Sequence, residues 1–444
     1  MAERTEEQLA RALKAAADLA PEPPADLAQC VAARRRRRDR RRLQTALAVT
    51  GVVAVIGTGM TVVKGAFVQR HDEAATEPAA TASVTATPRV TPTIAPAAKV
   101  WPDAVFRMPA KAPDGAAYRP VTALGPTQVL LAAERSMERA VRLEVYDTTT
   151  GTTTVLAKVP TPQGLAEYYV QAWDADERYI VWYATADSRR DGPVAMFWAV
   201  PREGGTPRLV YSLSGDQAAK VERVAIAGDR IAYSLSTGGV YTLPLDRPFG
   251  DADGPELIEG SEGLYLQQWP WAGDRPGQNG TDPARNQTLI VNLETGERRI
   301  VRAGDAQGVR CGATWCAGER YGEPRDDGRP RAVVQRYDGA ERRELESLRA
   351  APSLDGIVAD RFAVLSVSAV PGRGAPEVDA SKEPHPVAVV YDRVTGAMAA
   401  VGSWDKDGTG GFGRGTSSAP SDIVYWNAPG RPKEYWVLNL AAVP

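Results

Sequence analysis

A short unit that recurs from about Trp101 to the end of the chain most constrains what this sequence can fold into. Its clearest copies occupy residues 143–151, 289–296 and 389–396, where an apolar run ends at Asp or Asn and a Gly follows four residues later. An apolar run followed by such turn-forming residues is typical of a β-strand that ends in a tight turn. Weaker copies lie at residues 197–205, 240–245, 334–339 and 435–440. The outer part of the chain is therefore predicted to be an all-β repeat domain.

The spacing of the copies indicates which repeat architecture they form. The copies have seven equivalent positions: Asp147, Pro201, Pro244, Asn292, Asp338, Asp392 and Asn439. The intervals between them are 54, 43, 48, 46, 54 and 47 residues. A period near fifty residues, with four short strands in each unit, is typical of β-propeller blades. Seven copies predict a seven-bladed β-propeller. Six or eight blades, or a pair of packed sheets, remain the alternatives.

The last copy of the unit ends too close to Pro444 to include an outer strand. We expect residues 104–108, at the start of the domain, to supply that strand and to close the ring. Closure has a physical reason, because an open ring would expose two unpaired sheet edges.

A second constraint is an uncharged segment, residues 43–63, which is rich in Ala, Val and Gly. As a helix it would span roughly 30 Å, the thickness of the hydrocarbon layer of a membrane. Only Lys64 and Arg70 follow it closely, whereas eight arginines precede it: Arg34, Arg35, Arg36, Arg37, Arg38, Arg40, Arg41 and Arg42. The positive-inside rule then places the N-terminus in the cytoplasm and the repeats outside the cell. We interpret the arginines as topology and lipid-headgroup anchors.

Three other interpretations of this region are weaker. A cleaved signal peptide would have a shorter charged region and a small-residue cleavage motif. A buried core helix would not normally end in an arginine cluster, and a nucleic-acid patch is a less simple explanation next to a spanning helix. The predicted organisation is a cytoplasmic, helical, Arg-rich segment (1–42), a transmembrane helix (43–68), an Ala/Thr/Pro-rich disordered tether (69–100) and the propeller (101–444).

Cys311 and Cys316 are the sharpest local signal in the outer domain. If Ala313 and Thr314 form the tip of a hairpin, Gly312 pairs with Trp315 and the two cysteines face each other within disulfide range. An oxidising exterior favours the bond. We predict a structural disulfide, with a redox-active pair or two buried thiols as alternatives.

Trp269 and Trp271 precede a polar run at residues 276–286, where other units have a second strand. Adjacent indole rings next to a loop suit binding of a sugar or a peptide. The alternative is that both rings pack between blades. Residues 405–410 resemble the first half of a calcium loop, but Thr416 stands where a bidentate Glu is expected, so a Gly-rich turn is preferred.

The composition argues against several chemistries. The chain contains two histidines, His71 and His385, and it has no Gly-x-Ser-x-Gly motif, phosphate loop or dinucleotide fingerprint. We therefore expect no catalytic residues, no cofactor and no metal, and we predict that the protein is not an enzyme. A net charge of −2 gives no overall attraction to nucleic acid.

The chain resembles actinobacterial single-pass membrane proteins with an extracytoplasmic TolB- or WD40-like β-propeller. The resemblance rests on the Arg-rich stop before one apolar segment, the Thr/Pro tether and the Tyr-Asp-x-x-Thr-Gly units. The Gly-His and Trp-Asp pairs of WD40 repeats are missing from their fixed places, so the TolB-like pattern fits better. The resemblance implies a membrane-anchored module that binds or scaffolds a cell-envelope protein or carbohydrate ligand. One alternative is an anti-sigma-like signalling partner that contacts a sigma factor through residues 1–42. Another is a propeller-type lyase or hydrolase.

Overall fold

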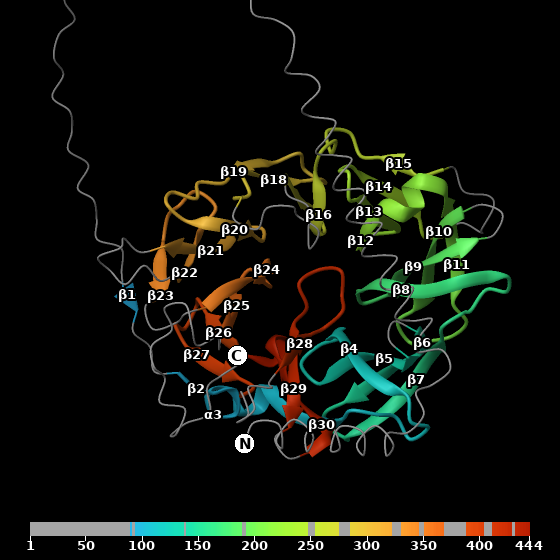
Figure 1. Ribbon diagram of the computed structural model, residues 1–444, viewed down its shortest axis with the longest axis horizontal. Coiled ribbons are helices and arrows are strands. Elements are labelled where there is room, and N and C mark those ends of the chain that lie inside the picture. The colour runs from blue at the N-terminus through green and yellow to red at the C-terminus, as the bar shows by residue number, and fades with distance from the viewer. Residues whose placement is uncertain are drawn as a thin grey trace, which may run out of the picture. The chain divides into compact units, whose positions relative to one another are not determined.

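Seven β-sheets stand side by side around a common centre in the computed structural model of the protein (Figure 1). The structure describes residues 89–90, 94–136, 139–188, 192–246, 254–274, 285–321, 330–345, 350–367, 388–403, 411–428 and 431–444. The predicted cytoplasmic segment, spanning helix and most of the tether lie outside these residues. Within them, no helix has both the length and the apolar character that crossing a membrane requires. The fold is a seven-bladed β-propeller, as the repeat period predicted.

Six blades are built from strands consecutive in sequence, with the first strand innermost and the last outermost (Figure 1). From the inside outward they are, for blade 1, β4 (Ala117–Ala123), β5 (Gln128–Ser136), β6 (Arg139–Asp147) and β7 (Thr152–Lys158); for blade 2, β8 (Leu165–Ala175), β9 (Tyr179–Ser188), β10 (Gly192–Pro201) and β11 (Arg208–Ser214); for blade 3, β12 (Val221–Ala227), β13 (Arg230–Leu235), β14 (Val240–Pro244) and β15 (Glu256–Leu257); for blade 4, β16 (Tyr265–Gln268), β17 (Trp271–Gly273), β18 (Leu289–Asn292) and β19 (Arg298–Ile300); for blade 5, β20 (Gln307–Cys311), β21 (Trp315–Tyr321), β22 (Pro330–Arg336) and β23 (Arg343–Leu345); and for blade 6, β24 (Ala350–Val358), β25 (Phe362–Val367), β26 (Ala388–Asp392) and β27 (Met398–Val401).

Blade 7 joins the two ends of the domain. Its first three strands are β28 (Phe412–Arg414), β29 (Ile423–Ala428) and β30 (Arg431–Asn439), and its outermost strand is β3 (Val105–Pro109). Strands β3 and β30 are antiparallel, with Val105 opposite Leu438 and Met108 opposite Tyr435. The predicted closing strand is therefore confirmed.

The recurrent turn has one structure in its three clearest copies. In blade 1, the Asp147 carboxylate accepts hydrogen bonds from the N–H groups of Thr149 and Thr150, at 2.8 and 3.0 Å. Gly151 then donates its N–H to the Asp147 carbonyl at 2.9 Å and has a φ of 69°, a conformation that favours glycine. Asn292 and Asp392 begin equivalent turns that end at Gly296 and Gly396.

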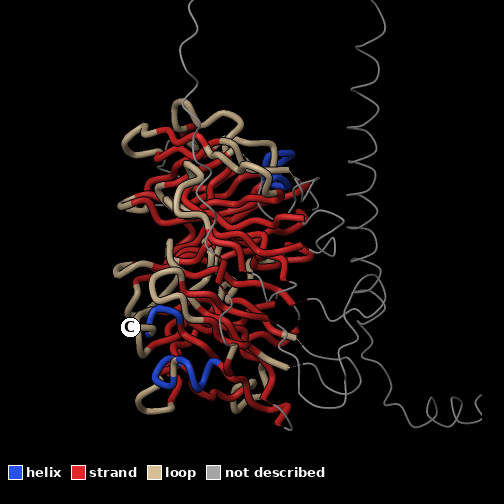
Figure 2. Tube along the Cα trace, turned by 90° about the vertical axis from the view of Figure 1, so that its left-hand side faces the viewer, coloured by secondary structure: helices blue, strands red, loops and turns tan. Residues whose placement is uncertain are grey.

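The core consists of seven apolar clusters, one in each seam between neighbouring blades. Both faces of a middle strand are therefore buried, and its sequence reads as a continuous apolar run. Residues 129–133 of β5 illustrate this, since all five are 0% exposed. The strands run from one face of the ring to the other, and the turns lie on these two faces. The C-terminus lies on one of them (Figure 2).

The N-terminal edge of the domain corrects the predicted end of the tether. Strand β1 (Arg89–Val90) pairs in parallel with β23, and β2 (Ala95–Pro96) pairs in parallel with β27, each as a fifth strand. Ile94 packs in the seam between blades 5 and 6, and both Trp101 and the buried start of α3 (Ala97–Val100) pack in the next seam. Proline is tolerated in an edge strand because no ladder hydrogen bond is lost there. The domain therefore begins by residue 89 and not at residue 101.

Candidate functional site

A loop of the chain itself crosses the centre of the ring. Residues 415–421, here called the crossing loop, connect β28 to β29 and run toward the inner strands of other blades (Figure 1). The backbone N–H groups of Thr416 and Ser417 donate to the carbonyl oxygens of Pro120 and Val121 in blade 1, at 3.2 and 3.1 Å. The Ser418 N–H donates to a carbonyl of blade 2, that of Trp173, at 2.6 Å. The loop is thus bonded to two blades beyond its own.

Ser418 also links the crossing loop to blade 3. Its hydroxyl accepts a hydrogen bond from the Val224 N–H at 2.8 Å, and its carbonyl accepts one from the Arg223 guanidinium at 2.6 Å. The same guanidinium donates to the carbonyl of Gln267 in blade 4 at 3.1 Å. Arg223 therefore joins blades 3, 4 and 7 at the inner side of the ring.

The start of the crossing loop is tightly enclosed. A Cβ atom at Gly415 would lie 2.0 Å from Ser421 Oγ and 2.1 Å from the Val121 carbonyl oxygen, far inside contact distance. Ser421 is 3% exposed, and its hydroxyl donates to that same carbonyl at 3.0 Å. Sequence reasoning missed this loop. The only local signal is an uncharged run with Gly and Ser next to a short strand, and nothing in that pattern indicates where the loop docks.

Asp174 lies beside the crossing loop, in the seam between blades 2 and 3. Its Oδ2 accepts a hydrogen bond from the Ile226 N–H at 2.8 Å. Burial raises the pKa of the Asp174 carboxyl to about 7, because this N–H and that of Ala175 offset the lost hydration only in part. Burial also raises the pKa of Asp422, against the opposing charge of Arg414. The inner side of the ring thus contains a carboxyl group that titrates near neutral pH.

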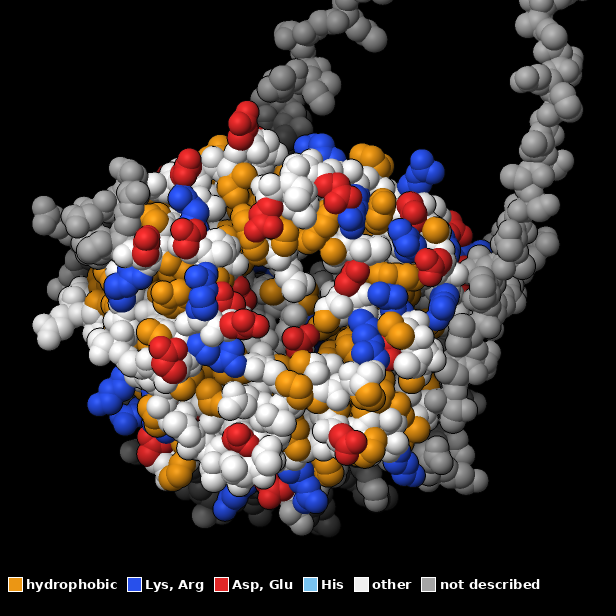
Figure 3. Space-filling model, turned by 180° about the vertical axis from the view of Figure 1, so that it is seen from behind, with side chains coloured by type: hydrophobic (Ala, Val, Ile, Leu, Met, Phe, Trp, Pro, Cys, Tyr) orange, Lys and Arg blue, Asp and Glu red, His pale blue; other side chains and the backbone are white. Residues whose placement is uncertain are grey.

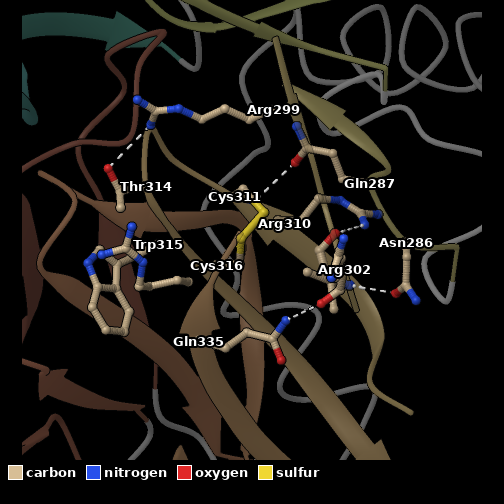
Figure 4. The surroundings of a disulfide bond; sticks show 12 residues. Asn286, Gln287, Arg299, Arg302, Arg310, Cys311, Thr314, Trp315, Cys316 and Gln335 are labelled. Atoms are coloured by element: carbon tan, nitrogen blue, oxygen red, sulfur yellow. Dashed lines mark hydrogen bonds between the residues drawn. A yellow bond between two sulfur atoms is a disulfide. The ribbon is translucent and has the colours of Figure 1, made fainter. Parts of the chain in front are cut away.

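The predicted disulfide between Cys311 and Cys316 is confirmed. The two Cα atoms are 3.9 Å apart, and Gly312 donates its N–H to the Trp315 carbonyl at 2.8 Å, as the hairpin interpretation required. Both sulfur-bearing residues are buried in the seam between blades 4 and 5. Gln287 and Gln335 flank the bond (Figure 4), and Gln287 Oε1 accepts the Cys311 N–H at 2.9 Å. The disulfide closes the inner hairpin of blade 5.

Trp269 and Trp271 lie on opposite sides of blade 4. Trp269 packs against the cluster between blades 3 and 4 and donates its indole N–H to Glu294 at 2.9 Å. Trp271 packs against the cluster between blades 4 and 5, with the Arg299 guanidinium 4.3 Å from the centre of its ring. The described contacts are those of packing between blades, and ligand binding by this pair stays a prediction.

Several other sequence candidates fall outside the described residues. These are His385, residues 276–284 of the polar run and the calcium-like stretch at 405–410. In the part of the chain that the structure describes, no group of three or more His, Cys, Asp or Glu side chains is arranged to hold a metal ion.

The two faces and the rim of the ring present side chains to solvent. On the face seen in Figure 3, Lys and Arg side chains are interspersed with Asp and Glu around a central hollow. Across the described residues, large apolar side chains are exposed at four positions, three of them on outermost strands: Val155, Leu257, Ile300 and, in a turn, Val394. Three of these four exposed apolar side chains therefore lie on the rim of the ring.

No family model matches the sequence, and no curated protein matches it. Many solved structures resemble the fold at low identity. YCF48 from Cyanidioschyzon merolae is 7% identical over 75% of this chain and 98% of that chain, with a TM-score of 0.41. BamB from Moraxella catarrhalis is 10% identical over 71% and 82% of the two chains, with a TM-score of 0.32. An oligogalacturonate lyase from Vibrio parahaemolyticus is 14% identical over 70% and 74%, with a TM-score of 0.29. The assignment to a propeller rests on the sheet topology described above.

Proposed function

We propose that this chain is a membrane-anchored binding or scaffolding module of the cell envelope, whose propeller holds a protein or carbohydrate partner on its outer surfaces. The observation that carries the proposal is the crossing loop. A propeller surrounds a central channel, and here the chain's own residues 415–421 are bonded across that position to the inner strands of three other blades. Faces and rim are then the surfaces that a partner would use.

Two features support a location outside the cell. The uncharged segment 43–63 follows eight arginines, a pattern typical of a spanning helix with a cytoplasmic N-terminus. The hairpin of blade 5 contains the Cys311–Cys316 disulfide, a bond that persists mainly in oxidising compartments.

The seams between blades support a scaffolding role. Each blade is packed on both faces, and the ring is closed by pairing of β3 with β30, so the outer surfaces are held in fixed positions. A preorganised surface loses little conformational entropy when it binds. Loops on such a scaffold are common binding elements.

The proposal is tested by immobilising the propeller, residues 89–444, and passing membrane and cell-wall fractions over it. We expect one partner to be retained reproducibly, and to be lost when the propeller is thermally unfolded before the experiment. Retention that survives protease treatment of the fractions would identify a carbohydrate, and retention that does not would identify a protein. Failure of the folded propeller to retain anything above the unfolded control would contradict the proposal.

A further inference from the structure

The chain adds a fifth strand to two neighbouring blades at almost the same place. On blade 6, Ala95 and Pro96 of β2 pair with Ala399 and Ala400. On blade 5, Arg89 and Val90 of β1 pair with Glu344 and Leu345. Both added strands run parallel to the outermost strand of the blade. The outer edges of blades 5 and 6 therefore accept an extended segment in one common orientation.

The pairing registers identify the equivalent position in blade 4. Ala400 pairs with Val389, three residues before Asp392, and Ile300 pairs with Leu289, three residues before Asn292. Asp392 and Asn292 begin the same recurrent turn, so Ile300 corresponds to Ala400. The described residues of blade 4 form four strands, β16 to β19. Ile300 is 65% exposed, the highest value among the large apolar side chains exposed in the described part of the chain.

The seam beside each edge shows what an added segment would cover. Next to β2, Ile94 packs in the seam between blades 5 and 6, against the cluster that contains Val389 and Met398. In blade 4, Leu289 packs in the seam between blades 3 and 4, and Ile300 is its cross-strand partner. An apolar side chain placed like Ile94 would therefore lie against Ile300 at the rim of this seam.

The charge at this edge indicates the kind of segment that fits. Arg298 and Arg302 are exposed on either side of Ile300, whereas the neighbouring Arg299 is engaged with Glu297 at 2.8 Å and with the Ala313 carbonyl at 2.7 Å. The chain's own residues 78–88 contain no acidic residue. Charge complementarity thus favours an acidic segment of another protein over this stretch.

We propose that the outer edge of blade 4 is a docking site for an extended segment of a partner protein, which pairs with β19 as a parallel fifth strand. Main-chain hydrogen bonds to β19 give affinity, an apolar side chain of the segment covers Ile300, and acidic side chains beside it meet Arg298 and Arg302. This inference rests on the proposed binding function and specifies the kind of partner and the edge that it occupies.

The test places a photo-crosslinking residue at position 300 of the full chain in its own membrane. The matched control is the same residue at Val155, which is 55% exposed on the outermost strand of blade 1, where Gly205 already donates its N–H to the Leu156 carbonyl. We expect position 300 to give one dominant adduct with another protein, whose linked peptide has Asp or Glu within two residues of the attachment point. The double variant R298E/R302E should lower the yield about tenfold or more, because like charges would then face each other.

Three outcomes would overturn the proposal. The adduct could join residues 78–88 of the same chain, or the same edge of a second copy, or it could form no better than at Val155. If position 300 gives no adduct while the immobilised propeller still retains a partner, only the docking edge is wrong. If neither experiment gives a partner, the proposed function fails as well.

Discussion

The Arg361 guanidinium forms a bidentate ion pair with the Asp392 carboxylate, with Nε 2.9 Å from Oδ1 and Nη2 2.7 Å from Oδ2. The same guanidinium donates to the carbonyl oxygens of Val443 and Pro444, at 3.3 and 2.6 Å. Asp392 is 0% exposed and begins the recurrent turn of blade 6. The Arg361 side chain therefore connects the turn between β24 and β25, the turn between β26 and β27 and the C-terminal residues.

Replacing Arg361 with Ala should destabilise the propeller by about 2–4 kcal/mol at pH 7, because it leaves a buried carboxylate without its ion partner. Burial alone would raise the pKa of Asp392, but Arg361, Thr395 and the Val394 N–H lower it below its ordinary value. This contribution is present above the unfolded pKa of about 4 and is lost as the pH falls through the folded pKa. In denaturant unfolding, the difference in free energy of unfolding between the wild type and the Arg361→Ala variant should therefore be smaller at pH 3 than at pH 7.

An exposed ion pair provides the control for Arg361. Arg230 and Glu256 are 2.8 Å apart, but the Glu256 side chain is 73% exposed. Replacing Arg230 with Ala should cost about 1 kcal/mol or less. Equal losses for the two variants would contradict the role assigned to Arg361.

Replacing Asp174 with Asn should stabilise the protein at high pH. Burial raises the folded-state pKa of this carboxyl to about 7, so its ionisation costs stability as the pH rises from about 4 through 7. Asn keeps an oxygen for the Ile226 N–H but has no charge to bury. Unfolding free energies should coincide near pH 4 and favour the variant by roughly 1–3 kcal/mol at pH 8. The exposed carboxyl of Asp229 supplies the control, and an equal pH-dependent gain in D229N would contradict the role assigned to the burial of Asp174.

Replacing Gly415 with Ala should displace the crossing loop, because the added Cβ would overlap the Val121 carbonyl and the Ser421 hydroxyl. We expect a loss of about 2–4 kcal/mol in the free energy of unfolding, together with faster proteolysis within residues 415–421. Gly411 is the matched control, since nothing lies within 4 Å of a Cβ built there. If the Gly411 variant loses as much stability as the Gly415 variant, the docking of the loop is not the cause.

The N-terminal segment should contribute measurably to the stability of the ring. A protein that begins at residue 101 lacks β1, β2 and the apolar contacts of Ile94 and Ala97. We expect its free energy of unfolding to be about 2–4 kcal/mol lower than that of a protein that begins at residue 89, because buried apolar contacts are lost. Starting at residue 89 or at residue 69 should give the same stability. Equal stability of the 89 and 101 proteins would mean that the added strands do not support the ring.

Features set by local sequence could be predicted without the structure. The blade count followed from the spacing of seven copies of one unit. In the clearest copies the turn begins at Asp147, Asn292 or Asp392, and that side chain and the Gly four residues later determine the turn together. The disulfide followed in the same way, since a two-residue hairpin brings Cys311 opposite Cys316.

Features set by distant contacts could not be predicted in this way. The crossing loop is held by main-chain groups of other blades, which no local pattern encodes. The strands at residues 89–90 and 95–96 occur in a composition typical of a tether, and they form because the edges of β23 and β27 accept them. Trp269 and Trp271 point to different seams because the chain reverses direction between β16 and β17.

We propose that the propeller lies outside the cell, anchored by residues 43–63. To test this location, a reporter enzyme that is active only outside the cytoplasm is fused after Pro444, both in the full chain and in a chain without residues 43–63. We expect reporter activity from the full chain and none from the deletion. Reporter activity confined to the cytoplasm in the full chain would contradict it.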